Sequence, residues 1–262
     1  MNDFKTLRLE QDGDVLSVYI DREEKANTIT IELIKEMISL ADWLRESEEI
    51  KYVIFTNNGR FFSAGYNLYD LYKDVKDVED QHNLRLMQVL GQEMINKLEN
   101  LEQVTFSAIR GSAYGGGVAI ALTADFRIMA DHTVLGLPET NIGMFLSWGC
   151  TPRLVRLVGA TKAKELILFG GEITAEESCR LGIVNKVCPV NEVDSEVHQM
   201  ISKLRTKGQQ AISITKKLIN ASVSPNFGDI LLTEPDLTKP IVYAGEITEK
   251  VEDFLARKGK RG

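Results

Sequence analysis

The segment Gly111-Ser112-Ala113-Tyr114-Gly115-Gly116-Gly117-Val118-Ala119 decides how this chain folds. It follows an apolar run at residues 104–109 and leads into the small apolar residues 118–122, so a strand is predicted to turn here into a helix. Glycine permits positive φ and close approach of a ligand, and a helix N-terminus presents unpaired N–H groups. Such a turn can hold a developing oxyanion. A tight turn that binds nothing explains a lone glycine triplet equally well.

Strands and helices are predicted to alternate on both sides of this turn. The expected strands are residues 4–10, 15–20, 51–56, 104–109 and 126–130, and the expected helices are 30–44, 84–98, 118–122, 174–182, 192–204 and 210–221. This alternation predicts α/β layers, in which active sites gather at strand-to-helix loops. We expect two parts: a core at residues 1–190 that holds the site, and a helical region at 191–262 that covers the site and serves in oligomerisation.

Composition excludes several classes of function. The chain has 262 residues, 44% of them hydrophobic, and a formal net charge of −7, so nucleic acid is not an expected partner. No stretch is long and apolar enough to span a membrane, and we expect a soluble, cytoplasmic protein. The three cysteines lack metal or redox spacing, so no metal site is expected and each is predicted to be reduced and buried.

Two loops and one carboxylate form the candidate site. The loop at residues 63–67 and the loop at 111–117 each follow a predicted strand, and each can offer one backbone N–H. Two amide donors that converge on one oxygen would stabilise a thioester enolate by several kcal/mol, since a single oxyanion donor contributes ~3 kcal/mol. Glu139, after the strand-like piece that ends at Leu137, supplies a carboxylate.

Along almost its whole length the sequence resembles the crotonase superfamily, the enoyl-CoA hydratase/isomerase family. The order and spacing of several short motifs carry the resemblance: residues 21–27 (DREEKAN), 62–65 (FSAG), 111–117 (GSAYGGG), 124–127 (ADFR), 138–139 (PE) with 142–143 (IG), 152–154 (PRL) and 249–258 near the end. The resemblance implies a spiral of ββα units followed by a C-terminal helical region that builds a homotrimer, or a hexamer made of two trimers. It also implies an acyl-CoA thioester as substrate, with no cofactor other than the coenzyme A of that substrate.

By position in the family's motifs, the amides of Tyr66 and Gly116 would form the oxyanion hole, and Glu139 would be the catalytic carboxylate. The resemblance implies further contacts to the CoA moiety: the backbone around Ala64 at the adenine, Lys25 near the phosphates, and Asn67, Leu68, Phe254 and Arg257. Asn67 stands where many members carry aspartate, which would change the support of the loop. Residues 68–73 and 144–148 would line the acyl pocket, although ordinary core packing explains them as well.

The sequence departs from the family's hydratases at Ala119. Those members place one glutamate there and a second twenty residues later, whereas this chain retains Glu139 alone. Hydration needs one group to activate water and a proton delivered to the α-carbon, so a single carboxylate suits it poorly. A 1,3-proton shift needs one base. The favoured function is therefore a Δ3 to Δ2 enoyl-CoA isomerase with Glu139 as proton shuttle.

Two other functions remain open. A hydratase, hydrolase or decarboxylase of the same superfamily would use Asp70, the Tyr66 hydroxyl or Lys73 as the second group. A non-catalytic acyl-CoA-binding subunit would have lost activity together with the carboxylate at Ala119. The chain does not resemble the dienoyl-CoA isomerases of the family at one further position, because those members carry an additional acid where this chain has Ser147.

Overall fold

The computed structural model describes residues 4–76, 81–222, 248, 251–252 and 255–256. The strands form two separate sheets. The larger has the order β1-β2-β3-β5-β7-β10, with β1 antiparallel to β2 and the other neighbours parallel; its strands are β1 (Leu7–Asp12), β2 (Val15–Ile20), β3 (Tyr52–Asn57), β5 (Val104–Ile109), β7 (Phe126–Ala130) and β10 (Lys186–Cys188).

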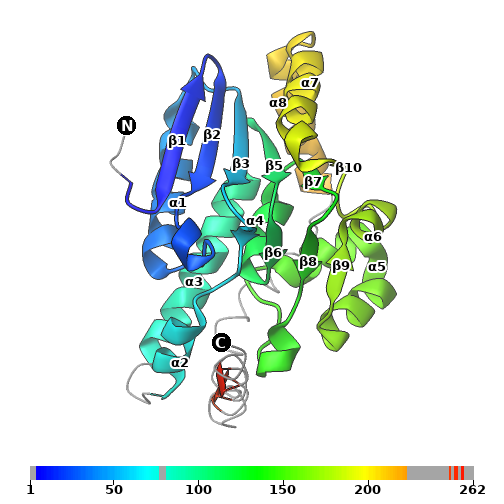
Figure 1. Cartoon of the computed structure of the whole chain (residues 1–262). Coiled ribbons are helices and arrows are strands. Elements are labelled where there is room, and N and C mark those ends of the chain that lie inside the picture. The colour runs from blue at the N-terminus through cyan, green and yellow to red at the C-terminus, as the bar shows by residue number, and fades with distance from the viewer. Residues whose placement is uncertain (1–3, 77–80, 223–247, 249–250, 253–254, 257–262) are drawn as a thin grey trace.

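The smaller sheet has the order β4-β6-β8-β9 and continues the larger one (Figure 1). Its strands are β4 (Phe61–Ser63), β6 (Ser112–Tyr114), β8 (Val134–Gly136) and β9 (Glu172–Thr174). Two successive turns of the chain each add one strand to each sheet and then a helix: β3 and β4 are followed by α2 (Leu68–Lys76), and β5 and β6 by α4 (Gly116–Thr123). The predicted α/β spiral of ββα units is confirmed.

Sequence reasoning missed strands β4, β6 and β9 of the smaller sheet and indicated β8 only as a strand-like piece that ends at Leu137. These strands have three residues each, too few to show an alternation of polar and apolar side chains. The central strands β3 and β5 were found because they are buried at every position, as is typical of parallel strands covered on both faces.

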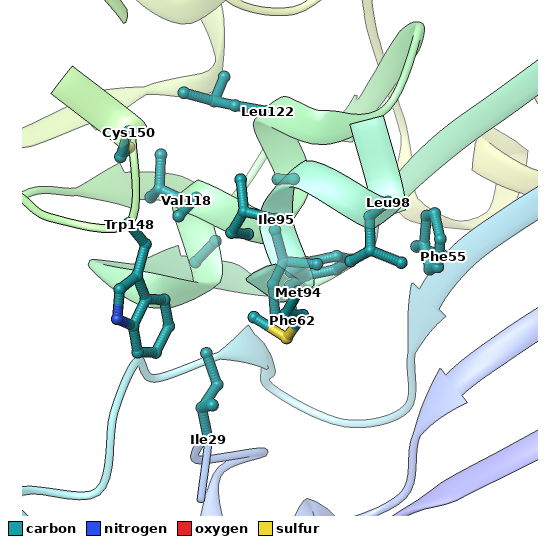
Figure 2. Packing of buried hydrophobic residues seen from close by; sticks show 14 of the residues in the cluster. Ile29, Phe55, Phe62, Met94, Ile95, Leu98, Val118, Leu122, Trp148 and Cys150 are labelled. Atoms are coloured by element: carbon teal, nitrogen blue, oxygen red, sulfur yellow. The ribbon is translucent and has the colours of Figure 1, made fainter. Parts of the chain in front are cut away.

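Helices cover both faces of the larger sheet. On one face the main core joins α1 (Ile31–Glu46), α3 (Gln81–Glu99) and α4, and Figure 2 shows its side chains around Met94 and Phe62. On the other face α7 (Val193–Arg205) packs Val193, Val197 and Ile201 against β3, β5 and β7. The remaining helices are α5 (Cys150–Phe169), α6 (Ala175–Arg180) and α8 (Gln209–Ser222), with short 3-10 helices η1 (Glu23–Lys25), η3 (Glu139–Ile142) and η4 (Val190–Glu192).

Two local predictions had different outcomes. Thr174 caps α6, its side chain accepting a hydrogen bond from the Glu177 backbone N–H at 3.2 Å, as the spacing of these two residues indicates. The prediction that all cysteines are buried was wrong for Cys179, which is exposed at the polar end of α6, whereas Cys150 and Cys188 are buried. Among the described residues, no helix is both long and apolar enough to cross a membrane.

Candidate active site

The glycine triplet forms the turn between β6 and the N-terminus of α4, as predicted. Gly115 has φ +49 and ψ −113, a conformation available almost only to glycine. A Cβ on Gly115 would also lie 2.5 Å from Oε1 of Glu139. The first glycine is therefore required twice, by its backbone conformation and by the carboxylate packed on it.

The other two glycines are required by close neighbours. A Cβ on Gly116 would lie 2.5 Å from Cζ3 of Trp148, and a Cβ on Gly117 would lie 2.6 Å from the carbonyl oxygen of Ser63. Figure 2 shows the Trp148 ring beside Ile29 at the margin of the apolar cluster. The triplet thus lets α4 approach β4 on one side and an indole ring on another.

The loop after β4 lies directly against this turn because β4 and β6 pair in parallel. Gly65 has φ +86, and a Cβ there would lie 2.9 Å from the Tyr114 carbonyl oxygen and 3.7 Å from the Gly116 nitrogen. Among the described residues, neither the N–H of Tyr66 nor that of Gly116 has a hydrogen-bond acceptor. Two free amide donors therefore occur on neighbouring loops.

Glu139 begins η3, just after β8 and Pro138. Its Oε2 is shielded from solvent and has no hydrogen-bond partner within the described part of the chain. Burial raises the pKa of the Glu139 carboxyl to about 7, and a hydrogen bond to its own backbone opposes this only partly. A carboxyl group whose pKa lies near neutrality can both accept and return a proton.

A cavity of about 380 Å³ joins these groups. Its walls include both glycine-bearing loops, η3 and the segment at residues 144–148, which was expected to line an acyl pocket. Glu139 is the sole carboxylate among the described residues that line it, and no described lysine or arginine does so. Ala119 lines the cavity with a bare methyl group.

Tyrosine hydroxyls are the other titratable groups of this cavity. Burial, and then the nearby charges of Asp74 and Asp70, raise the pKa of the Tyr66 hydroxyl well above its usual value. Burial and a 2.6 Å hydrogen bond donated to Glu172 raise the pKa of the Tyr114 hydroxyl to about 12. Both phenols therefore stay protonated at neutral pH and can donate but not act as bases.

Of the residues expected to contact the CoA moiety, some line the cavity and others do not. Ala64 and Leu68 line the cavity, and the Ala64 N–H donates to the Ala26 carbonyl at 3.0 Å, which places exposed Lys25 of η1 beside that loop. Asn67 does not line the cavity; its Oδ1 accepts from the Tyr69 N–H at 2.9 Å and supports the start of α2. Phe254 and Arg257 lie outside the described residues.

The groups considered as a second acid or base lie mostly outside the cavity wall. Asp70 and Lys73 belong to α2, where Lys73 is exposed and Asp70 half-buried, and neither lines the cavity. Tyr66 is the one of the three candidates that does so.

Sequence reasoning missed Gln88 as a residue of the cavity, and it expected Trp148 there only as a bulky group of the segment at residues 144–148, not as a polar one. Gln88 of α3 is fully buried, and both atoms of its amide lack a partner among the described residues, as does Nε1 of Trp148. Each unpaired buried polar group costs ~1–3 kcal/mol. One signal was available: Gly91, an isolated glycine inside a helix, usually has a packing reason, and a Cβ there would collide with the Trp148 indole at Nε1.

A larger cavity of about 680 Å³ lies elsewhere, between α5, α8 and the end of α4. Several of its charged groups pair with one another: Lys216 with Asp125 at 2.7 Å, and Arg153 and Arg156 with Glu99. Both described carboxylates that line it are held in these ion pairs, whereas Oε2 of Glu139 has no partner among the described residues, so the smaller cavity is the better candidate active site.

Comparison with known proteins shows similarities over nearly the whole chain. Residues 10–259 match the family model described as enoyl-CoA hydratase/isomerase. The chain is 31% identical over 261 residues to a short-chain-enoyl-CoA hydratase of Clostridium acetobutylicum, covering 95% of this chain and 97% of that protein. It is 29% identical to a crotonyl-CoA hydratase of Syntrophomonas wolfei, covering 89% and 88%. The crystal structure of an enoyl-CoA hydratase from Bacillus halodurans superposes with a TM-score of 0.89 at 25% identity, covering 95% of this chain and all of that one.

Proposed function

The chain belongs to the enoyl-CoA hydratase/isomerase family, and from this premise we propose that it moves the double bond of an enoyl-CoA from the Δ3 to the Δ2 position. One observation carries the proposal. Glu139 is the sole carboxylate lining the cavity in the described part of the chain, and Ala119 contributes only a methyl group there. A single carboxylate with a pKa of about 7 suits a reaction that removes and returns one proton.

The proposed reaction assigns a role to each of these groups. Ionised Glu139 takes a proton from C2 of a 3-enoyl thioester, and the electron pair of that C–H bond enters a dienolate. The N–H groups of Tyr66 and Gly116 donate to the thioester oxygen, where negative charge develops; each such donor contributes ~3 kcal/mol in related sites. Protonated Glu139 then returns the proton to C4, which places the double bond between C2 and C3.

The CoA moiety is proposed to bind on the side of η1. Ala64 and Leu68 would contact it directly, Asn67 would hold the loop, and Lys25 would lie near the phosphates. Phe254 and Arg257 are proposed to complete this contact in a homotrimer or a dimer of trimers. Coenzyme A enters as part of the substrate, and the mechanism uses no further cofactor.

A second function, hydration of a 2-enoyl-CoA, is favoured by the names of the relatives in Clostridium and Syntrophomonas. It would require a group besides Glu139, either to hold the attacking water or to deliver a proton to the α-carbon. Tyr66 is the described candidate inside the cavity, and its raised pKa permits donation but not proton abstraction.

A direct assay separates the proposals. A purified sample given 3-hexenoyl-CoA should gain the ultraviolet absorbance of a conjugated enoyl thioester, whereas the same sample given 2-hexenoyl-CoA should lose it only slowly. Fast loss with the second substrate and no gain with the first would establish the hydratase. Binding of acyl-CoA without any reaction would establish a non-catalytic subunit.

The pH dependence of isomerisation tests the role of Glu139. Because the base must be ionised in the free enzyme, kcat/KM should rise with pH and level off above an apparent pKa of about 7. Initial rates from pH 5 to 9 measure this profile. A midpoint near 4.5, the ordinary value for glutamate, would show that the carboxyl is not desolvated in the working enzyme.

A further inference from the structure

The wall of the acyl cavity contains polar groups that the proposed reaction does not use. These are the side-chain amide of Gln88 and Nε1–H of Trp148, all without a partner among the described residues. They belong to one location, because Gln88 lies one helical turn before Gly91, whose Cα faces the indole at Nε1. Together they offer two kinds of donor and one carbonyl acceptor.

The position of Trp148 is maintained against several structural costs. Trp148 has φ +54, a left-handed conformation that is rare for a bulky residue. It requires glycine at position 91 inside α3 and glycine at position 116 at the start of α4. A side chain that only fills space would not need this backbone conformation or these two glycines. An apolar residue would also fill the space without leaving an unpaired N–H in the core. Unusual backbone conformations of this kind gather at ligand sites.

The indole also connects the reacting centre with these polar groups. Its six-membered ring lies against Gly116 and meets the Tyr66 ring edge-on, with centroids 6.2 Å apart, whereas its Nε1 lies at the opposite end of the ring system, toward α3. An acyl chain whose thioester oxygen is held at Gly116 and Tyr66 would run along this ring. Its distal part would then reach Gln88 and Nε1.

The chemistry of this wall selects the distal group. The acceptor Oε1 of Gln88 needs a donor, and Nε2 of Gln88 and Nε1 of Trp148 need an acceptor. A hydroxyl group satisfies both requirements. A carboxylate could only accept, and no described cation lines the cavity to compensate its burial.

From this, and resting on the proposed function, we propose that the preferred substrate is an acyl-CoA whose chain carries a neutral hydroxyl group beyond the reacting carbons, bound by Gln88 and Trp148. Gln88 and Trp148 are then specificity-determining residues. A plain alkyl chain would leave the three polar atoms unpaired, and a site built to bond a hydroxyl discriminates strongly against an analogue that lacks it.

Calorimetric titration with unreactive saturated ligands tests this inference separately from catalysis. 6-Hydroxyhexanoyl-CoA should bind the full chain at least ~10-fold tighter than hexanoyl-CoA. Gln88→Leu should abolish that preference without lowering Tm, because it removes unpaired polar atoms from a buried position. Trp148→Phe, which keeps an aromatic ring but no N–H, should reduce the preference in the same direction. Met87→Leu, on the same wall, should leave the ratio of the two affinities unchanged.

The outcomes are distinguishable from failure of the proposed function. Equal binding of the two ligands, or a preference retained in Gln88→Leu, would overturn the inference and indicate that water occupies the polar wall. If neither 6-hydroxyhexanoyl-CoA nor hexanoyl-CoA binds, the proposal that the substrate is an acyl-CoA fails. Isomerase activity with 3-hexenoyl-CoA together with equal binding leaves the proposed function intact and removes the hydroxyl preference alone.

Discussion

Glu139→Gln is expected to lower kcat/KM for double-bond migration by ~10²- to 10⁴-fold, the usual contribution of a general base. Glutamine has nearly the same shape but cannot accept a proton, so the affinity for a saturated acyl-CoA should change little. Steady-state isomerisation and calorimetric binding measure the two effects. Undiminished isomerisation would rule out Glu139 as the proton shuttle.

Although Glu139→Gln should lose activity, it should be more stable than the parent protein at high pH. Burial raises the pKa of Glu139 from 4.5 to about 7, so the folded state holds its proton more tightly than the unfolded state. Stability from this group therefore falls as pH rises through that interval and stays low above it. The uncharged amide of the variant carries no such loss, and the Tm of the variant should exceed that of the parent protein at pH 8 but not at pH 4.

Asp70→Asn is the matched control. Asp70 also lies close to Tyr66, but it does not line the cavity. Its replacement should leave isomerisation within a few-fold of the parent rate. A loss as large as that of Glu139→Gln would show that a second carboxylate takes part and would favour a two-group mechanism.

Gly115→Ala is expected to lower kcat by at least ~10²-fold and to destabilise the fold by ~1–3 kcal/mol. The activity falls because the new Cβ would lie 2.5 Å from Oε1 of Glu139, so the carboxylate must move, and a displacement of ~1 Å can cost ~10²-fold in rate. The stability falls because a side chain is strained at the Gly115 backbone angles. Kinetics and urea unfolding measure the two losses.

Gly13→Ala separates strain from chemistry. Gly13 has φ +59 in the turn between β1 and β2, and a Cβ there meets nothing within 4 Å. This control should lose stability but retain full activity. If Gly115→Ala also retained full activity, the packing of Glu139 on the glycine turn would have no catalytic role.

The sequence indicated the fold through features that are local along the chain. Strands β3 and β5 are buried throughout, α1 has helical spacing with Thr30 as its cap, and the glycine triplet marks a strand-to-helix turn. These signals come from local backbone preferences and from the pattern of apolar residues, and both can be recognised within a few neighbouring positions of the sequence. The three-residue strands were not predictable, because their pairing partners lie far away in the sequence.

The site was predictable only where its residues belong to recognisable motifs. Tyr66, Gly116 and Glu139 were identified from the order of those motifs. The sequence marks Gln88 only as one position of a predicted helix, and it marks Trp148 as one of several bulky residues that either line an acyl pocket or belong to the core. Nothing local distinguishes a buried glutamine with a partner from one without.

By itself the sequence indicated the family, the main strands and helices, the glycine turn and the alanine at position 119, since each is carried by residue identity and short-range spacing. Only the tertiary structure showed why three glycines are needed: a side chain on the first, second or third would collide with Glu139, Trp148 or Ser63, respectively. It also decided that the Glu139 carboxyl is desolvated and that Gln88 and Trp148 line the same cavity. These properties depend on which distant segments exclude water from a group, and burial of that kind exists only once the chain has folded.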